Sequence, residues 1–151
     1  MSPLDPQPLI LVVDDDVDTC LLLTTWLERH GYATRTATSG AEALAIVARE
    51  PVTLLLLDIV MPDMDGFAVC AALRRTPAGR RLPILLVTGH DDLAMRRQGM
   101  RHGVSEFLTK PVELDALLER VRAQLRMVEL TRSLDRVERM LDGRLAALTG
   151  R

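Results

Sequence analysis

The stretch "LLLLDIVMPDMDG", residues 54–66, decides the fold, because four consecutive leucines run directly into an aspartate, Asp58. A strand with one face in water alternates apolar and polar residues, whereas this run is apolar at every position. It therefore predicts a strand that is buried on both faces. Ligands bind at the carboxyl ends of the strands of a parallel sheet, and Asp58 lies at such an end, so it is a candidate functional group.

Outward from this strand, strands and helices alternate along the chain. Strand patterns occur at residues 9–13, 32–37, 52–58, 82–89 and 104–111, and three of them are apolar throughout. Helical patterns occur at residues 17–30, 39–50, 66–76, 91–103 and 112–125. This alternation predicts an α/β fold in which helices cover both faces of a doubly wound, five-stranded parallel sheet.

Composition limits the classes of function. The chain has 151 residues, 48% of them hydrophobic and 26% charged, and a net charge of −2, as expected of one globular domain without a surface for direct nucleic acid binding. Both cysteines, Cys20 and Cys70, lie in apolar helical patterns, so we expect buried thiols and no disulfide. Without a signal-peptide pattern or a long apolar run, we expect a cytoplasmic protein and no membrane insertion.

Polar groups also follow the other apolar strands. Residues 14–16 are three aspartates after the first strand, Thr88 ends the fourth and Lys110 follows the fifth. Because parallel strands end at one edge of the sheet, we expect these groups to meet Asp58. Clustered carboxylates need a cation, and oxygen ligands suit Mg²⁺, with Mn²⁺ as a possible substitute. A lysine and a hydroxyl beside that metal predict phosphoryl chemistry in which Asp58 attacks phosphorus.

Four motifs, "VVDDD", "LLLLDIVMPDMDG", "LLVTG" and "EFLTKP", occur in an order and at spacings that resemble the receiver domains of bacterial two-component response regulators, the CheY-like family. The resemblance covers roughly residues 9–126. It implies a flavodoxin-like strand order of 2-1-3-4-5 and a signalling domain rather than an enzyme. It also implies a phosphodonor, either a sensor histidine kinase or a histidine phosphotransfer protein, and an output partner that the sequence does not identify.

The resemblance assigns roles to individual residues. Asp58 is the expected phosphoacceptor, and Asp15 and Asp58 are expected to ligate Mg²⁺ directly, with Asp14 acting through water. The expected set is completed by the backbone carbonyl of Val60 as a metal ligand, Thr88 and Phe107 as switch residues, Lys110 as the ion-pair partner, and Met61, Pro62, Gly66 and Pro111 as structural residues of the loops.

Two positions depart from the common family pattern. Val60 offers no polar side chain to the site, and His90 stands where the family often has a small or acidic residue. Those positions tune how long the phosphoryl group lasts in this family, so the lifetime is not predicted. Phe107 replaces a tyrosine, which removes a hydroxyl but leaves a ring that can change position.

Local patterns give simpler interpretations for some residues. Asp16 and Asp18 are typical helix N-terminal acids, and Ser39 with Glu42 has the spacing of a capping box. In the first helix, the spacing predicts an apolar face that comprises Val17, Leu21, Leu23, Trp26 and Leu27.

Three alternatives to a phosphorylated receiver match parts of the sequence. An aspartate-nucleophile phosphatase of the haloacid-dehalogenase type would use the acids of "DDDVD", but Asp18 occupies the fifth position and the chain has no room for a cap insertion. An EF-hand loop would need glycine at Thr19 and glutamate at Thr25. A degenerate receiver that only binds a partner keeps the fold, but all the expected site residues are present.

Residues 127–151 form a helical extension that is too short for an output domain. Met127, Leu130, Leu134, Val137 and Leu141 repeat at spacings of three and four, which is a heptad pattern. We expect a lead-in at 1–8, a receiver at 9–126 and an extended helix at 127–151. The extension is either a homodimerisation helix or the start of a connection to a further domain.

Overall fold

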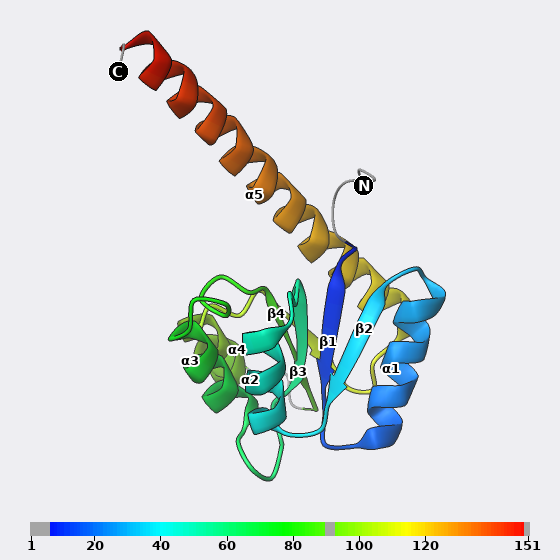
Figure 1. The fold of residues 1–151 in the computed structure, drawn as a ribbon. Helices are drawn as coiled ribbons and strands as arrows, with labels where there is room; N and C mark the ends of the chain where they lie inside the picture. The colour runs from blue at the N-terminus through cyan, green and yellow to red at the C-terminus, as the bar shows by residue number, and fades with distance from the viewer. Residues whose placement is uncertain (1–6, 90–92, 150–151) are drawn as a thin grey trace.

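A computed structural model describes residues 7–89 and 93–149, so the expectation for His90 lies outside the described residues. Within those ranges the chain forms five strands and five helices that alternate (Figure 1). The strands are β1 (Leu9–Val13), β2 (Ala33–Ala37), β3 (Leu54–Asp58), β4 (Ile84–Thr88) and β5 (Glu106–Thr109). The helices are α1 (Val17–Arg29), α2 (Gly40–Arg49), α3 (Gly66–Arg74), α4 (Leu93–Arg101) and α5 (Leu114–Leu148).

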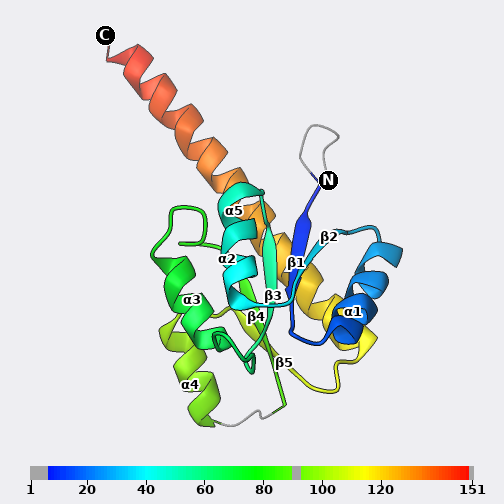
Figure 2. The same ribbon diagram turned by 60° about the horizontal axis from the view of Figure 1, so that its bottom comes forward.

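The five strands form one parallel sheet in the order β2-β1-β3-β4-β5. Figure 2 shows α1 and the first part of α5 on one face of this sheet and α2, α3 and α4 on the other. The register aligns Val13 with Leu57 and Asp58 with Val87, so the carboxyl ends of β1, β3 and β4 meet at one edge. The predicted doubly wound fold and its strand order are confirmed.

The run of four leucines is explained by two hydrophobic cores. Leu55 and Leu57 pack into the core beneath α2 and α3, whereas Leu54 and Leu56 pack into the core beneath α1 and α5. All four are 0–1% exposed. Because successive side chains of a strand point to opposite faces, a central strand between two helix layers must be apolar at every position.

The predicted inner face of α1 is wrong in part. Val17 and Leu21 are 66% and 64% exposed, while Leu23 and Leu27 are buried together with Cys20. Three consecutive leucines, residues 21–23, leave the spacing of the apolar face ambiguous, and only packing against the sheet selects which leucine turns inward.

Helix ends confirm several local predictions. Asp16 is the N-cap of α1, and its side chain accepts a hydrogen bond from the Asp18 N–H at 3.0 Å. Ser39 caps α2 by accepting from the Glu42 N–H at 3.1 Å. Both cysteines are buried and free, as expected.

Arg74, at the end of α3, fastens the side of the domain opposite the carboxyl ends of the strands. Its guanidinium donates hydrogen bonds of 2.8–3.4 Å to five backbone carbonyls, those of Gly79, Arg80, Leu82, His102 and Gly103. One side chain therefore joins the end of α3, the loop before β4 and the end of α4.

Helix α5 is one continuous helix of 35 residues. It crosses residue 126 without a break, and its last turns project from the domain into solvent (Figure 1). No helix in the described part of the chain is long and apolar enough to cross a membrane.

Candidate functional site

The ends of two buried strands position a pair of buried carboxylates. Asp58 is the last residue of β3 and Asp14 directly follows β1, and they are only 5% and 3% exposed. The Asp14 N–H donates to the Ala37 carbonyl at 3.1 Å, and its Oδ1 accepts from the Asp16 N–H at 2.9 Å. These bonds hold the turn after β1 against β2, so the Asp14 carboxylate keeps a defined orientation.

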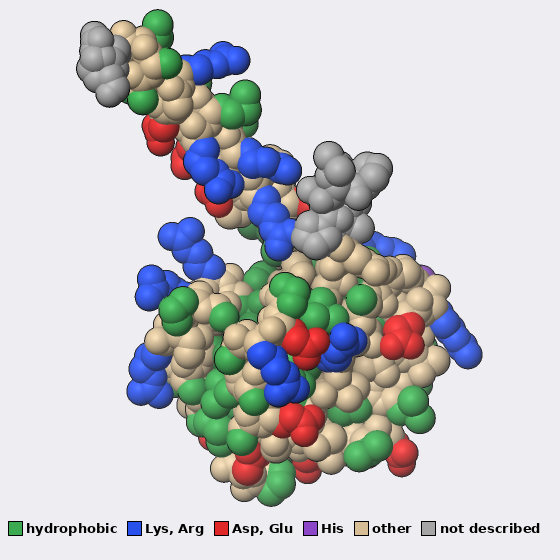
Figure 3. Space-filling view, viewed as in Figure 1, with side chains coloured by type: hydrophobic (Ala, Val, Ile, Leu, Met, Phe, Trp, Pro, Cys, Tyr) green, Lys and Arg blue, Asp and Glu red, His purple; other side chains and the backbone are tan. Residues whose placement is uncertain are grey.

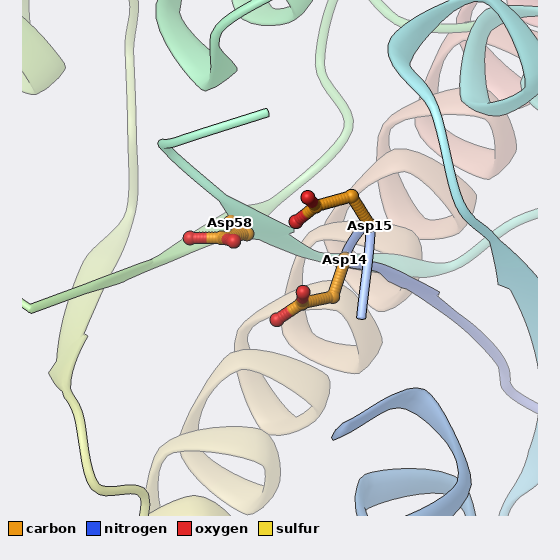
Figure 4. A group of neighbouring side chains, drawn as sticks. All are labelled: Asp14, Asp15 and Asp58. Atoms are coloured by element: carbon orange, nitrogen blue, oxygen red, sulfur yellow. The ribbon is translucent and has the colours of Figure 1, made fainter. Parts of the chain in front are cut away.

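Asp15 completes a group of three carboxylates. One oxygen from each of Asp14, Asp15 and Asp58 lies within 4.8 Å of the others, and Asp15 is exposed while its two neighbours are buried. Figure 4 shows the carboxylates of Asp14 and Asp15 directed toward the side of the group where Asp58 lies. An all-oxygen group with one side open to solvent fits a hard divalent cation that keeps some of its water ligands, as Mg²⁺ does.

Lys110 brings the compensating charge from the other side. Its Nζ lies 3.3 Å from Asp14 Oδ2 and 3.3 Å from Asp58 Oδ2. The Lys110 N–H donates to the Thr88 carbonyl at 2.8 Å, and the Lys110–Pro111 peptide bond is cis. The chain therefore turns directly after β5, with the ammonium group directed at both buried carboxylates.

The electrostatics of the pair follow from burial. Loss of solvation raises the pKa of Asp58 above its usual range, and the charge of Asp14 raises it further, while Lys110 opposes both effects. Burial tends to lower the pKa of Lys110, but the charges of Asp58 and Asp14 raise it overall. A second cation would relieve the repulsion that the single lysine leaves between the two carboxylates.

The loop after Asp58 is held close by Gly66. A Cβ on Gly66 would lie 2.8 Å from the Asp58 carbonyl oxygen and 2.9 Å from Ile59 Cα, and the Gly66 N–H donates to the Ile59 carbonyl at 2.7 Å. Met61 is buried and Pro62 is exposed in the same loop. A side chain at Gly66 would therefore displace the backbone of Asp58.

Val60 lies at the mouth of the group of carboxylates. Its side chain is 70% exposed, and its N–H donates to Asp58 Oδ1 at 3.4 Å. The predicted metal contact of its carbonyl stays a prediction.

The two expected switch residues are buried at the ends of neighbouring strands. Thr88 ends β4 and is 2% exposed, while Phe107 on β5 is 7% exposed. A Cβ on Gly99 of α4 would lie 2.5 Å from Phe107 Cζ, and Arg96 Cζ lies 5.2 Å from the centre of the ring. The ring therefore occupies an inward position that exists only because residue 99 has no side chain.

Two residues of this region were missed from the sequence. Asp63 accepts hydrogen bonds from the N–H groups of Gly40 and Ala41 at 3.2 Å, and the bond to Gly40 is the main cause that lowers the Asp63 pKa. Asp63 thereby ties the loop after Asp58 to the start of α2. Gly99 was also missed, and neither position carries a local pattern that would reveal a partner so far away in sequence.

Comparison with known proteins places the site in a family. The profile of the response regulator receiver domain matches residues 10–122. Over 117 residues the chain is 44% identical to the response regulator PleD of Caulobacter vibrioides, which covers 78% of this chain and 26% of PleD. It is equally identical, over 117 residues, to the response regulator MprA of Mycobacterium leprae, with 78% and 50% covered. The chain thus spans a quarter to a half of these curated relatives.

Solved structures agree with the sequence matches. A CheY-like receiver domain protein from Methanospirillum hungatei superposes with a TM-score of 0.78 at 29% identity, covering 83% of this chain and 99% of that one. A response regulator from Chloroflexus aurantiacus has a TM-score of 0.75 at 34% identity, with 81% and 99% covered.

Proposed function

This chain belongs to the response regulator receiver domain family of two-component systems, and from that premise we propose that Asp58 accepts a phosphoryl group from a phosphohistidine donor. The observation that supports the proposal best is the position of Lys110 Nζ, 3.3 Å from both buried carboxylates. The donor class is a sensor histidine kinase or a histidine phosphotransfer protein, and the output partner is a separate question.

The transfer is a direct displacement at phosphorus. A carboxylate oxygen of Asp58 forms the new P–O bond, the P–N bond to the donor imidazole breaks, and the imidazole nitrogen keeps the electron pair. Lys110, already paired with Asp58, is placed to contact an oxygen of the transferred group. Asp14, Asp15, Asp58 and the Val60 carbonyl would hold Mg²⁺, which when bound offsets the negative charge of the phosphoryl oxygens.

The signal is a shift between two states of the domain. In the phosphorylated state Thr88, buried at the end of β4, would turn its hydroxyl toward the phosphoryl group, and Phe107 would be held in the inward position against Gly99 that it has in this structure. In this function the chain is a signalling domain that catalyses only its own phosphorylation and dephosphorylation. The exposed apolar side chain of Val60 cannot hydrogen-bond the water that would hydrolyse the phosphoryl group, so only backbone groups and solvent would position that water.

The proposal is tested by incubating the full chain with Mg²⁺ and acetyl phosphate and measuring its intact mass. Wild type is expected to gain one phosphoryl group, and Asp58→Asn is expected to gain none. Asp18→Asn is the matched control, because Asp18 is an acid in the first turn of α1 outside the group of carboxylates. An unmodified wild type, or equal modification of Asp58→Asn, would refute the assignment of Asp58.

A further inference from the structure

The last part of α5, residues 127–148, projects from the domain, and its first turns line a pocket with the loop before β4. The buried residues of this helix are Leu117, Leu118, Val121 and Leu125, and after Leu125 every described position is exposed except Val128, which is half-buried. Residues 127–148 extend for about 33 Å at 1.5 Å per residue. Figure 3 shows hydrophobic side chains among the arginines and acids of this projecting segment.

Seven large apolar side chains line one stripe of the segment, which we call the seam. They are 51–83% exposed: Met127, Leu130, Leu134, Val137, Leu141, Leu145 and Leu148. Their spacings are 3, 4, 3, 4, 4 and 3 residues. At about 100° per residue, all seven fall within roughly 80° around the helix axis. After Leu141 a strict heptad would place Arg144 in the seam, whereas the stripe continues through Leu145 and Leu148.

The extra spacing of four identifies the type of packing. A heptad repeat gives a left-handed supercoil, and inserting four residues locally unwinds it toward an eleven-residue repeat. Leu134 to Leu145 and Val137 to Leu148 are both separated by eleven residues. The insertion lies beside Gly143, whose missing side chain leaves open space around it.

The seam points away from the receiver domain. At 100° per residue, its mean direction lies about 170° around the helix from the mean direction of the four buried residues of α5. A second helix can therefore lie along the seam without meeting the sheet or the helices of its own domain.

We propose that the seam binds the seam of a second copy of this chain, which forms a two-stranded coiled coil over residues 127–148. An identical apolar stripe on each copy is self-complementary, and the four arginines and four carboxylates in this range leave no net charge to oppose pairing. A single exposed helix of this length, with a glycine in its last turns, is marginal in water, whereas pairing covers the exposed apolar surface. The association uses no residue of the phosphorylation site.

The molar mass of the full chain in solution tests the proposal. Light scattering is expected to give twice the 16.8 kDa of one chain for wild type and for Arg132→Glu/Arg139→Glu, whose substitutions lie off the seam. Leu134→Glu/Leu141→Glu introduces the same two residues into the seam and is expected to give 16.8 kDa. A monomeric wild type, or a dimer that survives the seam substitutions, would overturn the proposal.

Circular dichroism gives a second readout that does not depend on mass. The helical signal of wild type is expected to fall on dilution as the segment separates and frays, while that of the seam variant is expected to be low and independent of concentration. A concentration-independent, fully helical wild type that scatters as a monomer would show that the segment is a stable single helix. Phosphorylation of Asp58 is measured separately, so either proposal can fail alone.

Discussion

Replacing Gly99 with alanine should force Phe107 out of its inward position. The added Cβ would lie 2.5 Å from Cζ and 2.9 Å from Cε1 of the Phe107 ring, both closer than carbon atoms can approach. Alanine is otherwise the better helix former, by about 1 kcal/mol. The Phe107 ring is only 7% exposed in the folded protein. Moving it out into solvent costs about 2 kcal/mol. The net expectation is a free energy of unfolding lower by about 1 kcal/mol.

The same substitution should change sign when the ring is removed. In a Phe107→Leu background the two clashing ring atoms are absent, so Gly99→Ala should stabilise α4 by about 1 kcal/mol. The coupling between the two positions is then about 2 kcal/mol, measured by urea unfolding of the four chains of a double-mutant cycle. Gly143→Ala is the control, because a Cβ there meets nothing within 4 Å and should cause no loss of stability.

If Gly99→Ala stabilises the wild-type and Phe107→Leu chains equally, the ring does not depend on the space at residue 99 and the reasoning is wrong. The switch proposal adds a functional readout. Under that proposal the phosphorylated state holds the ring inward, so Gly99→Ala should weaken the binding of beryllofluoride by up to about tenfold, the equivalent of 1.4 kcal/mol. Unchanged affinity would separate the position of Phe107 from phosphorylation.

Other predictions follow from the same structure. Since the folded state raises the Asp58 pKa, it binds more protons than the unfolded chain between the usual carboxyl pKa and the raised one, and stability falls as pH rises through that window. Without Mg²⁺, Asp58→Asn should therefore be more stable than wild type at pH 7 in urea unfolding, with the gain vanishing below the ordinary pKa of 3.8; an equal gain at acid pH would contradict this. Arg74→Ala should lower the free energy of unfolding by about 3 kcal/mol, because several backbone carbonyls lose their donor. Arg74→Lys should recover less than half of this loss, because one ammonium group cannot replace the several N–H donors of the guanidinium group. Full rescue by lysine would show that these separate donors are unimportant. Burial raises the pKa of Cys20 and of Cys70 to about 11, so neither thiol should react with a maleimide at pH 8 until urea unfolds the domain, and labelling of the native chain would show local opening.

Much of the architecture can be predicted from local sequence patterns. The run of four leucines identifies a central strand, because only a strand between two helix layers is apolar at every position. The caps at Asp16 and Ser39 and the continuation of the last helix depend on residues within a few positions of one another, so they too are visible in the sequence. The candidate site residues could be proposed because parallel strands end at a common edge, which makes the residue after each strand a candidate.

The strand ends predict that Asp14, Asp58 and Lys110 share one edge of the sheet, but only the tertiary structure decides which of their atoms touch and how closely. Lys110 meets Asp14 across 96 positions of sequence, and Asp63 meets Gly40 across 23, through contacts that depend on sheet register and loop path. The same holds for Gly99 under the Phe107 ring and for the exposure of Val17 and Leu21 on α1. The periodicity of a sequence predicts which residues of an element are buried. It does not predict their partners, because each contact depends on how two elements pack against the same sheet.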